Sequence, residues 1–167
     1  MIKIGKNISE WSAYSCQPKT KDELKKIIED RIYKEGPNCD LNDIDTSLIE
    51  DMSYLFYGAK FTGDISGWNV SNVKKMEAMF ASSNFNGDIS KWNTSCVTNM
   101  TVAFAKSQFN GDISKWNVSK AEDMSGMFYE SKFNQDISKW KINKDCNVNS
   151  MFHECSIKDE YKPKLPK

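Results

Sequence analysis

The chain has 167 residues, and its 23 basic and 23 acidic side chains leave no formal net charge. Nucleic acids and anionic membranes attract proteins through an excess of positive charge, so this balance argues against both partners. The length favours a single domain, and no run of about 18 apolar residues occurs that could insert into a bilayer.

The segment that precedes the repeats is predicted to contain one helix. Thr20 followed by Glu23 forms a capping box, apolar residues recur on one face of residues 21–35, and Gly36 ends the run. We therefore expect residues 1–39 to be an N-terminal segment. Its helix, over about residues 21–35, should lie on the first repeat and cover its apolar end.

Residues 40–156 are interpreted as five repeats of 24 residues. A faint first unit is followed by four clear copies: FTGDISGWNVSNVKKMEAMFASSN, FNGDISKWNTSCVTNMTVAFAKSQ, FNGDISKWNVSKAEDMSGMFYESK and FNQDISKWKINKDCNVNSMFHECS. All nine phenylalanines fall in two columns of the repeat, and four of the five tryptophans share one column, namely Trp68, Trp92, Trp116 and Trp140. This fixed stride is typical of stacked coils in which each aromatic residue packs on its copy in the next coil.

Within a unit, the apolar spacing predicts a short strand followed by a helical turn. The run from Ile65 to Val70 ends in the alternation of a strand. The residues that follow helical spacing are Val73, Met76, Met79 and Phe80. We therefore predict a repeat solenoid of short parallel strands and helical turns with an N-terminal capping helix.

Two polar columns recur in the four clear copies. They are the aspartates Asp64, Asp88, Asp112 and Asp136 and the serines Ser66, Ser90, Ser114 and Ser138. An acid at the same place in every coil indicates a structural need, because short polar side chains accept hydrogen bonds from N–H groups that a turn leaves unpaired. An acid pair or a calcium site is the alternative, although the EF-hand loop pattern is absent.

The repeat pattern decays in the last unit, and residues 157–167 carry two prolines. We expect these residues to form an extended or mobile C-terminal tail. The decay fits a last coil that becomes polar and stops the stack.

Few residues suit catalysis or metal binding. His153 is the only histidine, and its spacing from Cys146 and Cys155 does not match a zinc motif. Cys155 occupies the column of Ser83, Ser107 and Ser131, which favours a packed residue over a nucleophile. Because five cysteines without paired short spacing do not form a disulfide framework, we expect reduced thiols. No enzyme activity, cofactor or metal is predicted.

The candidate partner-binding residues flank the tryptophan column. They are Lys91, Lys115 and Lys139 on one side, and Asn69, Asn93, Asn117 and Lys141 on the other. One interpretation is a lysine and asparagine ladder that meets an acidic protein or a glycan. The other is a solvated face that keeps the protein soluble.

The repeat unit, F-N-x-D-I-S-x-W-x-V followed by V-x-x-M-x-x-M-F, resembles the BspA-like leucine-rich-repeat surface proteins of bacteria. The resemblance covers residues 40–156 and is specifically to the short repeat of the mycoplasma lipoprotein type. It implies a right-handed leucine-rich-repeat-like solenoid and a role in adhesion or protein interaction at the cell surface.

The leading hypothesis is a non-catalytic interaction or adhesion module of a bacterial surface or secreted repeat protein. The alternative is a structural spacer, or a fragment of a larger repeat protein, with no binding role of its own. The family resemblance implies a surface or secreted location, whereas no signal peptide or lipobox is visible, which leaves a cytoplasmic location open. A protein or glycan partner and a monomeric state are expected.

Overall fold

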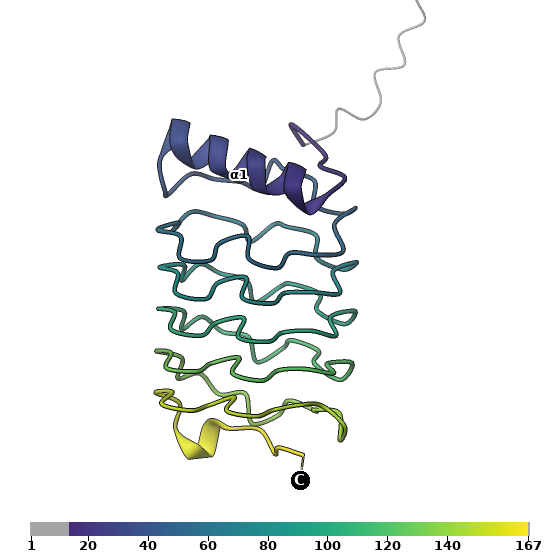
Figure 1. Ribbon diagram of the computed structural model, residues 1–167, viewed down its shortest axis with the longest axis vertical. Helices are drawn as coiled ribbons and strands as arrows, with labels where there is room; N and C mark the ends of the chain where they lie inside the picture. Colours follow the sequence, from purple (N-terminus) through teal and green to yellow (C-terminus); the bar gives the residue numbers. More distant parts are fainter. Residues whose placement is uncertain (1–13, 167) are drawn as a thin grey trace, which may run out of the picture.

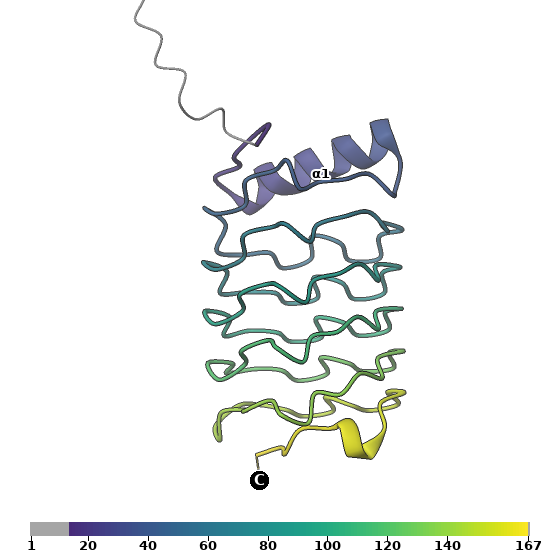
Figure 2. The same cartoon turned by 180° about the vertical axis from the view of Figure 1, so that it is seen from behind.

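The protein is a stack of coils with a helix lying across one end (Figures 1 and 2). The computed structural model describes residues 14–166. Its named elements are the α-helix α1 (Lys21–Glu35) and the short 3₁₀ helix η1 (Asp159–Tyr161). Between them the chain winds through successive coils, and no strand is assigned in the described part.

Of the six parallel backbone bridges in residues 14–166, five join residues that are 24 positions apart, which is the repeat length in the sequence. One series of bridges runs down the stack through Asp51, Lys75, Asn99, Asp123 and Asn147. Each bridge is isolated, so residues 14–166 contain no sheet.

The strands predicted beside the tryptophans are wrong. The N–H of Trp68 bonds to the carbonyl of Ile65 at 3.1 Å, which closes a turn where the strand was expected. The link to the neighbouring coil comes from the side chain, because the indole Nε1 of Trp68 donates to the carbonyl of Leu41 at 2.9 Å. The same indole bond recurs down the column and replaces part of a backbone ladder.

The predicted helical turns are also wrong. The N–H of Met79 bonds to the carbonyl of Met76 at 3.3 Å, which closes a four-residue turn. The N–H of Ala78 donates across to Thr101 in the next coil at 3.0 Å, whereas a helix would direct it four residues back. Apolar residues three apart fit consecutive turns as well as a helix. The leucine-rich-repeat-like coil of short strands and helical turns is therefore not the architecture of this chain.

These turns hold their third residue at positive φ, as type II turns require. The φ values lie between 48° and 64° in two columns, which are Tyr54, Ala78, Val102, Gly126 and Ser150, and Gly58, Ser82, Lys106, Glu130 and Glu154. Most of these residues are not glycine, so the contacts between coils must hold the backbone in a conformation that most side chains disfavour.

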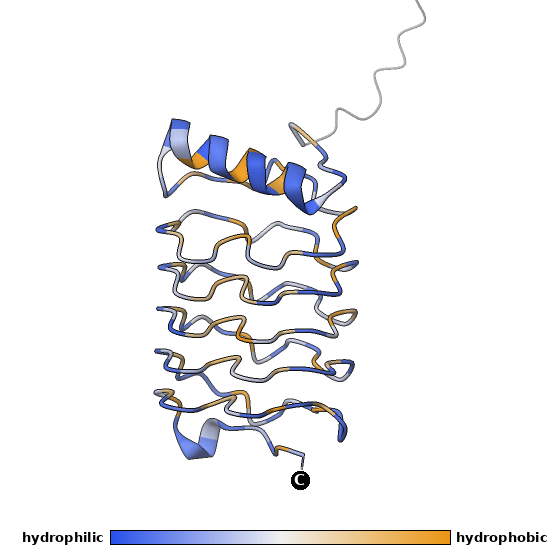
Figure 3. Cartoon of the chain, in the orientation of Figure 1, coloured by the Kyte–Doolittle hydropathy of each residue, from blue (hydrophilic) through white to orange (hydrophobic). Residues whose placement is uncertain are grey.

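Aromatic columns form the core, as the sequence pattern predicts. The ring centroids of Phe80 and Phe104 lie 5.4 Å apart, and those of Trp92 and Trp116 lie 6.3 Å apart with nearly parallel planes. All four side chains are buried. Burying a phenylalanine stabilises a fold by about 1.5–3 kcal/mol, so the columns are the main source of cohesion between coils. Figure 3 shows the corresponding alternation of apolar and polar residues along each coil.

Helix α1 covers the first coil and occupies the range expected from the sequence. It begins where the Thr20 hydroxyl accepts a hydrogen bond from the N–H of Glu23, and Gly36 follows its last residue at φ 93°. Leu24 and Ile28 are fully buried against the coils. The helix therefore shields the apolar end of the stack (Figure 3).

The other end is covered by residues after the last coil, which lie against it as extended backbone on both sides of η1. Ile157 and Pro163 are buried, and the carbonyl of Tyr161 accepts a hydrogen bond of 3.0 Å from the N–H of Ile137. The ammonium group of Lys162 lies 5.9 Å from the ring centroid of Phe152. The tail packs here because the last aromatic layer would otherwise face water.

Candidate functional site

The candidate partner-binding residues form two exposed rows beside the buried tryptophans, a lysine row and an asparagine row. A third row, of aspartates, is described in the next paragraph. We call the surface formed by these three rows the ladder face. The lysine row comprises Lys91, Lys115 and Lys139, and the asparagine row comprises Asn69, Asn93 and Asn117 and continues as Lys141. Each side chain is exposed. One shallow hollow brings members of both rows together, since it is lined by Lys115, Asn117, Lys139 and Lys141 beside Trp116 and Trp140.

The aspartate row lies three residues before the lysine row and was not counted in the sequence-based site. It comprises Asp64, Asp88, Asp112 and Asp136. Each carboxylate accepts a hydrogen bond of 2.8 or 2.9 Å from the N–H of the serine two residues later. This is the structural role that the sequence predicted for the column.

The serine contacts also set the charge of the aspartate row. The backbone N–H of Ser90 and the Ser90 hydroxyl hold the pKa of Asp88 below its ordinary value, and the nearby Lys91 ammonium adds to the effect. The pKa values of Asp112 and Asp136 are lowered by equivalent contacts. The ladder face therefore carries a negative row beside a positive row and is not uniformly basic.

Two acidic residues of the first coil occupy the positions that flank tryptophan in later coils. Asp43 and Asp45 lie on either side of Ile44, which stands 24 residues before Trp68. The sequence contains the signal that identifies them, because Asp43 and Asp45 lie one repeat length of 24 residues before Gly67 and Asn69.

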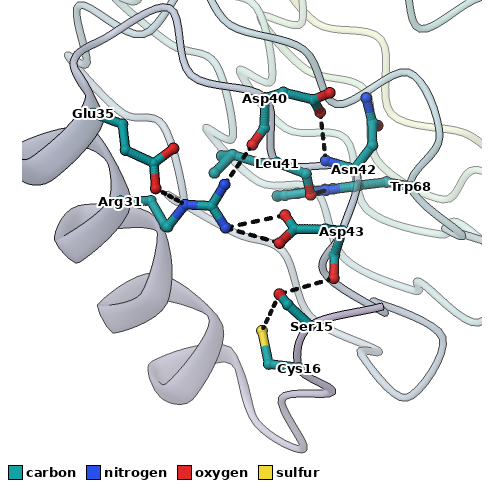
Figure 4. A network of polar contacts seen from close by, with 9 residues as sticks. All are labelled: Ser15, Cys16, Arg31, Glu35, Asp40, Leu41, Asn42, Asp43 and Trp68. Carbon is teal, nitrogen blue, oxygen red and sulfur yellow. Dashed lines mark hydrogen bonds and ion pairs between the residues drawn. The ribbon is translucent and has the colours of Figure 1, made fainter. Parts of the chain in front are cut away.

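The N-terminal segment engages these two acids, as Figure 4 shows for Asp43. The guanidinium of Arg31 in α1 contacts both carboxylate oxygens of Asp43 at 3.0 Å. A hydrogen bond from the Ser15 hydroxyl, together with Arg31, holds the pKa of Asp43 below its ordinary value. Gln17 donates to the carboxylate of Asp45 at 2.6 Å. The first coil thus serves as an attachment point for the helical cap.

The thiols and the histidine near the C-terminus do not converge. Cys146 is buried, and desolvation raises the pKa of its thiol. His153 is exposed and stacks on Tyr129 with 5.0 Å between ring centroids. The Sγ atom of Cys155 lies 3.4 Å from the Ser131 hydroxyl, so this cysteine packs within the serine column.

Within residues 14–166, no group of three His, Cys, Asp or Glu side chains is placed to hold a metal ion. The same part of the chain has no helix long and apolar enough to cross a membrane.

A family model described as "Mycoplasma protein of unknown function, DUF285" matches the chain twice, over residues 26–106 and 81–162. Together the matches span most of the 167 residues. The chain belongs to this family. The DUF285 match is consistent with the mycoplasma-type repeat that the sequence resembles, but it does not confirm the BspA-like leucine-rich-repeat assignment. No curated protein and no solved structure matches the chain.

The two DUF285 matches overlap within the coils and include most of α1 at one end and η1 at the other. The ladder face lies wholly inside the matched residues. Most of the helical cap, the coils and the candidate site are therefore parts of the DUF285 family region.

Proposed function

We propose that this DUF285 chain is a non-catalytic interaction module of a bacterial surface or secreted repeat protein, with the ladder face as its contact surface. The supporting observation is the exposure of the lysine and asparagine rows directly beside a column of buried tryptophans. A surface and adhesive role also accords with the resemblance of the repeat to BspA-like surface proteins.

The packing beneath the rows supports this proposal. Trp92 and Trp116 are 4% exposed, and their indole N–H groups bond to the coil before them. Each lysine adjacent to a tryptophan is therefore carried by a fixed backbone. Binding to a preorganised surface loses less conformational entropy than binding to a flexible one.

The charges of the rows suggest the chemistry of a partner. Lys91, Lys115, Lys139 and Lys141 form no ion pair with any residue that the structure describes. Their ammonium groups are available to carboxylates or sulfates, and the asparagine amides offer both donors and acceptors. An acidic protein surface or an anionic glycan fits this combination.

Binding measurements on charge-reversed variants test the proposal. The probes are polyglutamate and a sulfated glycosaminoglycan, each measured by biolayer interferometry against the immobilised protein. We expect the combined Lys91→Glu, Lys115→Glu and Lys139→Glu variant to bind at least about tenfold more weakly than wild type, because complementary charges become repulsive.

A matched control reverses three exposed lysines outside the lysine row, Lys60, Lys132 and Lys164, each to glutamate. It has the same net charge as the ladder variant and should keep most of the wild-type binding. An equal loss in both variants, or no binding by wild type, would contradict a contact role for the ladder face and favour the spacer function.

A further inference from the structure

We propose that the ladder face also pairs with the ladder face of a second copy, in a dimer whose two-fold axis runs parallel to the stack of coils. This inference rests on the proposed role of the ladder face in protein contacts and names a copy of the same chain as one partner. It departs from the monomer expected from the sequence.

Each copy carries two parallel rows of opposite charge. Asp88, Asp112 and Asp136 form one row, and the lysine three residues after each aspartate forms the other. In the part of the chain that is described, no aspartate of this row lies within ion-pair distance of a lysine of the other. Each carboxylate accepts a hydrogen bond of 2.9 Å from a serine N–H, and these contacts hold it in place at the corner without pairing it to a cation. Both rows therefore have charge available for a partner.

A two-fold axis that runs between the rows places the aspartate row of each copy against the lysine row of the other. Each coil of one copy then faces the same coil of the other copy. The distance between successive charges along the stack is therefore equal in the two copies, because both have the same 24-residue repeat. A two-fold axis along the coil direction would instead place aspartates opposite aspartates. Charge complementarity therefore selects the parallel arrangement.

The surface between the rows is hollowed where the contact would form. One hollow between the last two coils is lined by Asp112, Ser114 and Lys115 with Gln135, Asp136 and Lys139. This hollow gives space to long side chains from the second copy. Because the pairs would be partly exposed, the dimer should weaken as salt concentration rises.

A mixing experiment with two variants tests the pairing. The first variant combines Lys91→Glu, Lys115→Glu and Lys139→Glu, and the second combines Asp88→Asn, Asp112→Asn and Asp136→Asn. Asparagine should preserve the turns, since Asn69 and Asn93 already accept the equivalent hydrogen bond from Ser71 and Ser95. By sedimentation, wild type should dimerise, each variant alone should be monomeric, and the 1:1 mixture should form heterodimers.

Cross-linking tests the geometry independently. Ser114 lies between Asp112 and Lys115, close to the proposed axis, so Ser114→Cys should give a disulfide-linked dimer under mild oxidation. Ser119→Cys is the matched control, because Ser119 is also exposed and in the same repeat but lies beyond the asparagine row. It should give no more linked dimer than wild type, whose native cysteines set the background.

The dimer is overturned if wild type remains monomeric at about 200 µM in low salt, a concentration at which weak interfaces associate. It is also overturned if the two variants fail to associate when mixed, or if Ser119→Cys cross-links as well as Ser114→Cys. These outcomes leave the polyglutamate and glycan measurements unchanged, so failure of the dimer and failure of the proposed function are distinguishable.

Discussion

At the scale of single residues, the most unusual feature is the set of non-glycine residues at positive φ. Val102 is the extreme case, because it is β-branched and has a φ of 48°. A β-branched side chain crowds the backbone in the left-handed region, which disfavours this conformation by about 1–2 kcal/mol or more. The half-buried Val102 side chain packs against the cluster formed by Ala78, Ala81 and Ala105, which offsets part of this strain.

We expect Val102→Asn to stabilise the protein by about 0.5–1 kcal/mol. Asparagine tolerates the left-handed region well, and this relief should exceed the loss of a half-buried apolar contact. Urea denaturation of the variant and wild type measures the difference.

The reverse change in the same column is the control. Gly126 has a φ of 60°, and a Cβ atom added there would lie 3.0 Å from Cγ1 of Val102. Gly126→Val should therefore reduce stability by at least about 1 kcal/mol. If both variants change stability in the same direction, backbone strain is not the cause.

At the scale of the element, the unit of structure is the turn. In consecutive turns, every second backbone N–H group donates to a carbonyl of the same coil. The N–H groups between them donate to carbonyls of the next coil. Aspartate and asparagine side chains satisfy further N–H groups at the corners, as with Asp88 and Ser90. The turn thus combines a local hydrogen bond with a contact between coils, which neither an isolated helix nor a single strand provides.

The aspartate corners predict an acid-sensitive fold. The pKa values of Asp64, Asp88, Asp112 and Asp136 are lowered in the folded protein, chiefly by the serine two residues later. Their contribution is therefore complete above the unfolded pKa of about 3.9 and is lost as the pH falls through the lower folded values.

Thermal unfolding between pH 7 and pH 2 measures this effect. We expect wild type to lose stability below about pH 4, whereas the combined Asp88→Asn, Asp112→Asn and Asp136→Asn variant should lose less over the same range. Asparagine keeps the acceptor but cannot titrate. Parallel curves for the two proteins would show that the corners do not contribute to the acid dependence.

At the scale of the whole molecule, columns of like residues hold the coils in register. Trp92 stacks between Trp68 and Trp116, with centroid distances of 6.4 and 6.3 Å. Phenylalanine columns run beside it, and the caps close both ends. Each coil therefore depends on its neighbours, as in other repeat proteins.

Trp92→Ala should reduce the free energy of unfolding by about 3–5 kcal/mol, because it opens a cavity in the middle of the column and removes the indole bond to Ile65. Lys91→Ala, one residue away but exposed, should change it by less than about 0.5 kcal/mol. Chemical denaturation compares the two. A Trp92→Ala variant as stable as wild type would be inconsistent with the stacked core.

Part of the candidate site was predictable from the repeat. The lysine and asparagine rows follow from their positions beside Trp92 and Trp116, since neighbours of a buried residue tend to be exposed. The spacing of three residues between Asp88 and Lys91 also recurs in the sequence. Only the structure shows that both residues are exposed on the same face, where they form adjacent rows of opposite charge. The contact of Arg31 with Asp43 was not predictable, because it requires the position of α1 on the first coil.

The sequence by itself determined the repeat length, the aromatic columns, the polar corners and helix α1, because each depends on the regular spacing or local capping of particular side chains. Tertiary structure alone decided the path of the backbone between them. Val73, Met76, Met79 and Phe80 have the spacing of a helix, yet the N–H groups of Met76, Ala78 and Phe80 bond to carbonyls in the next coil. Stacking of the aromatic columns brings those carbonyls within reach, so hydrogen bonds between coils replace the helix that the local pattern favours.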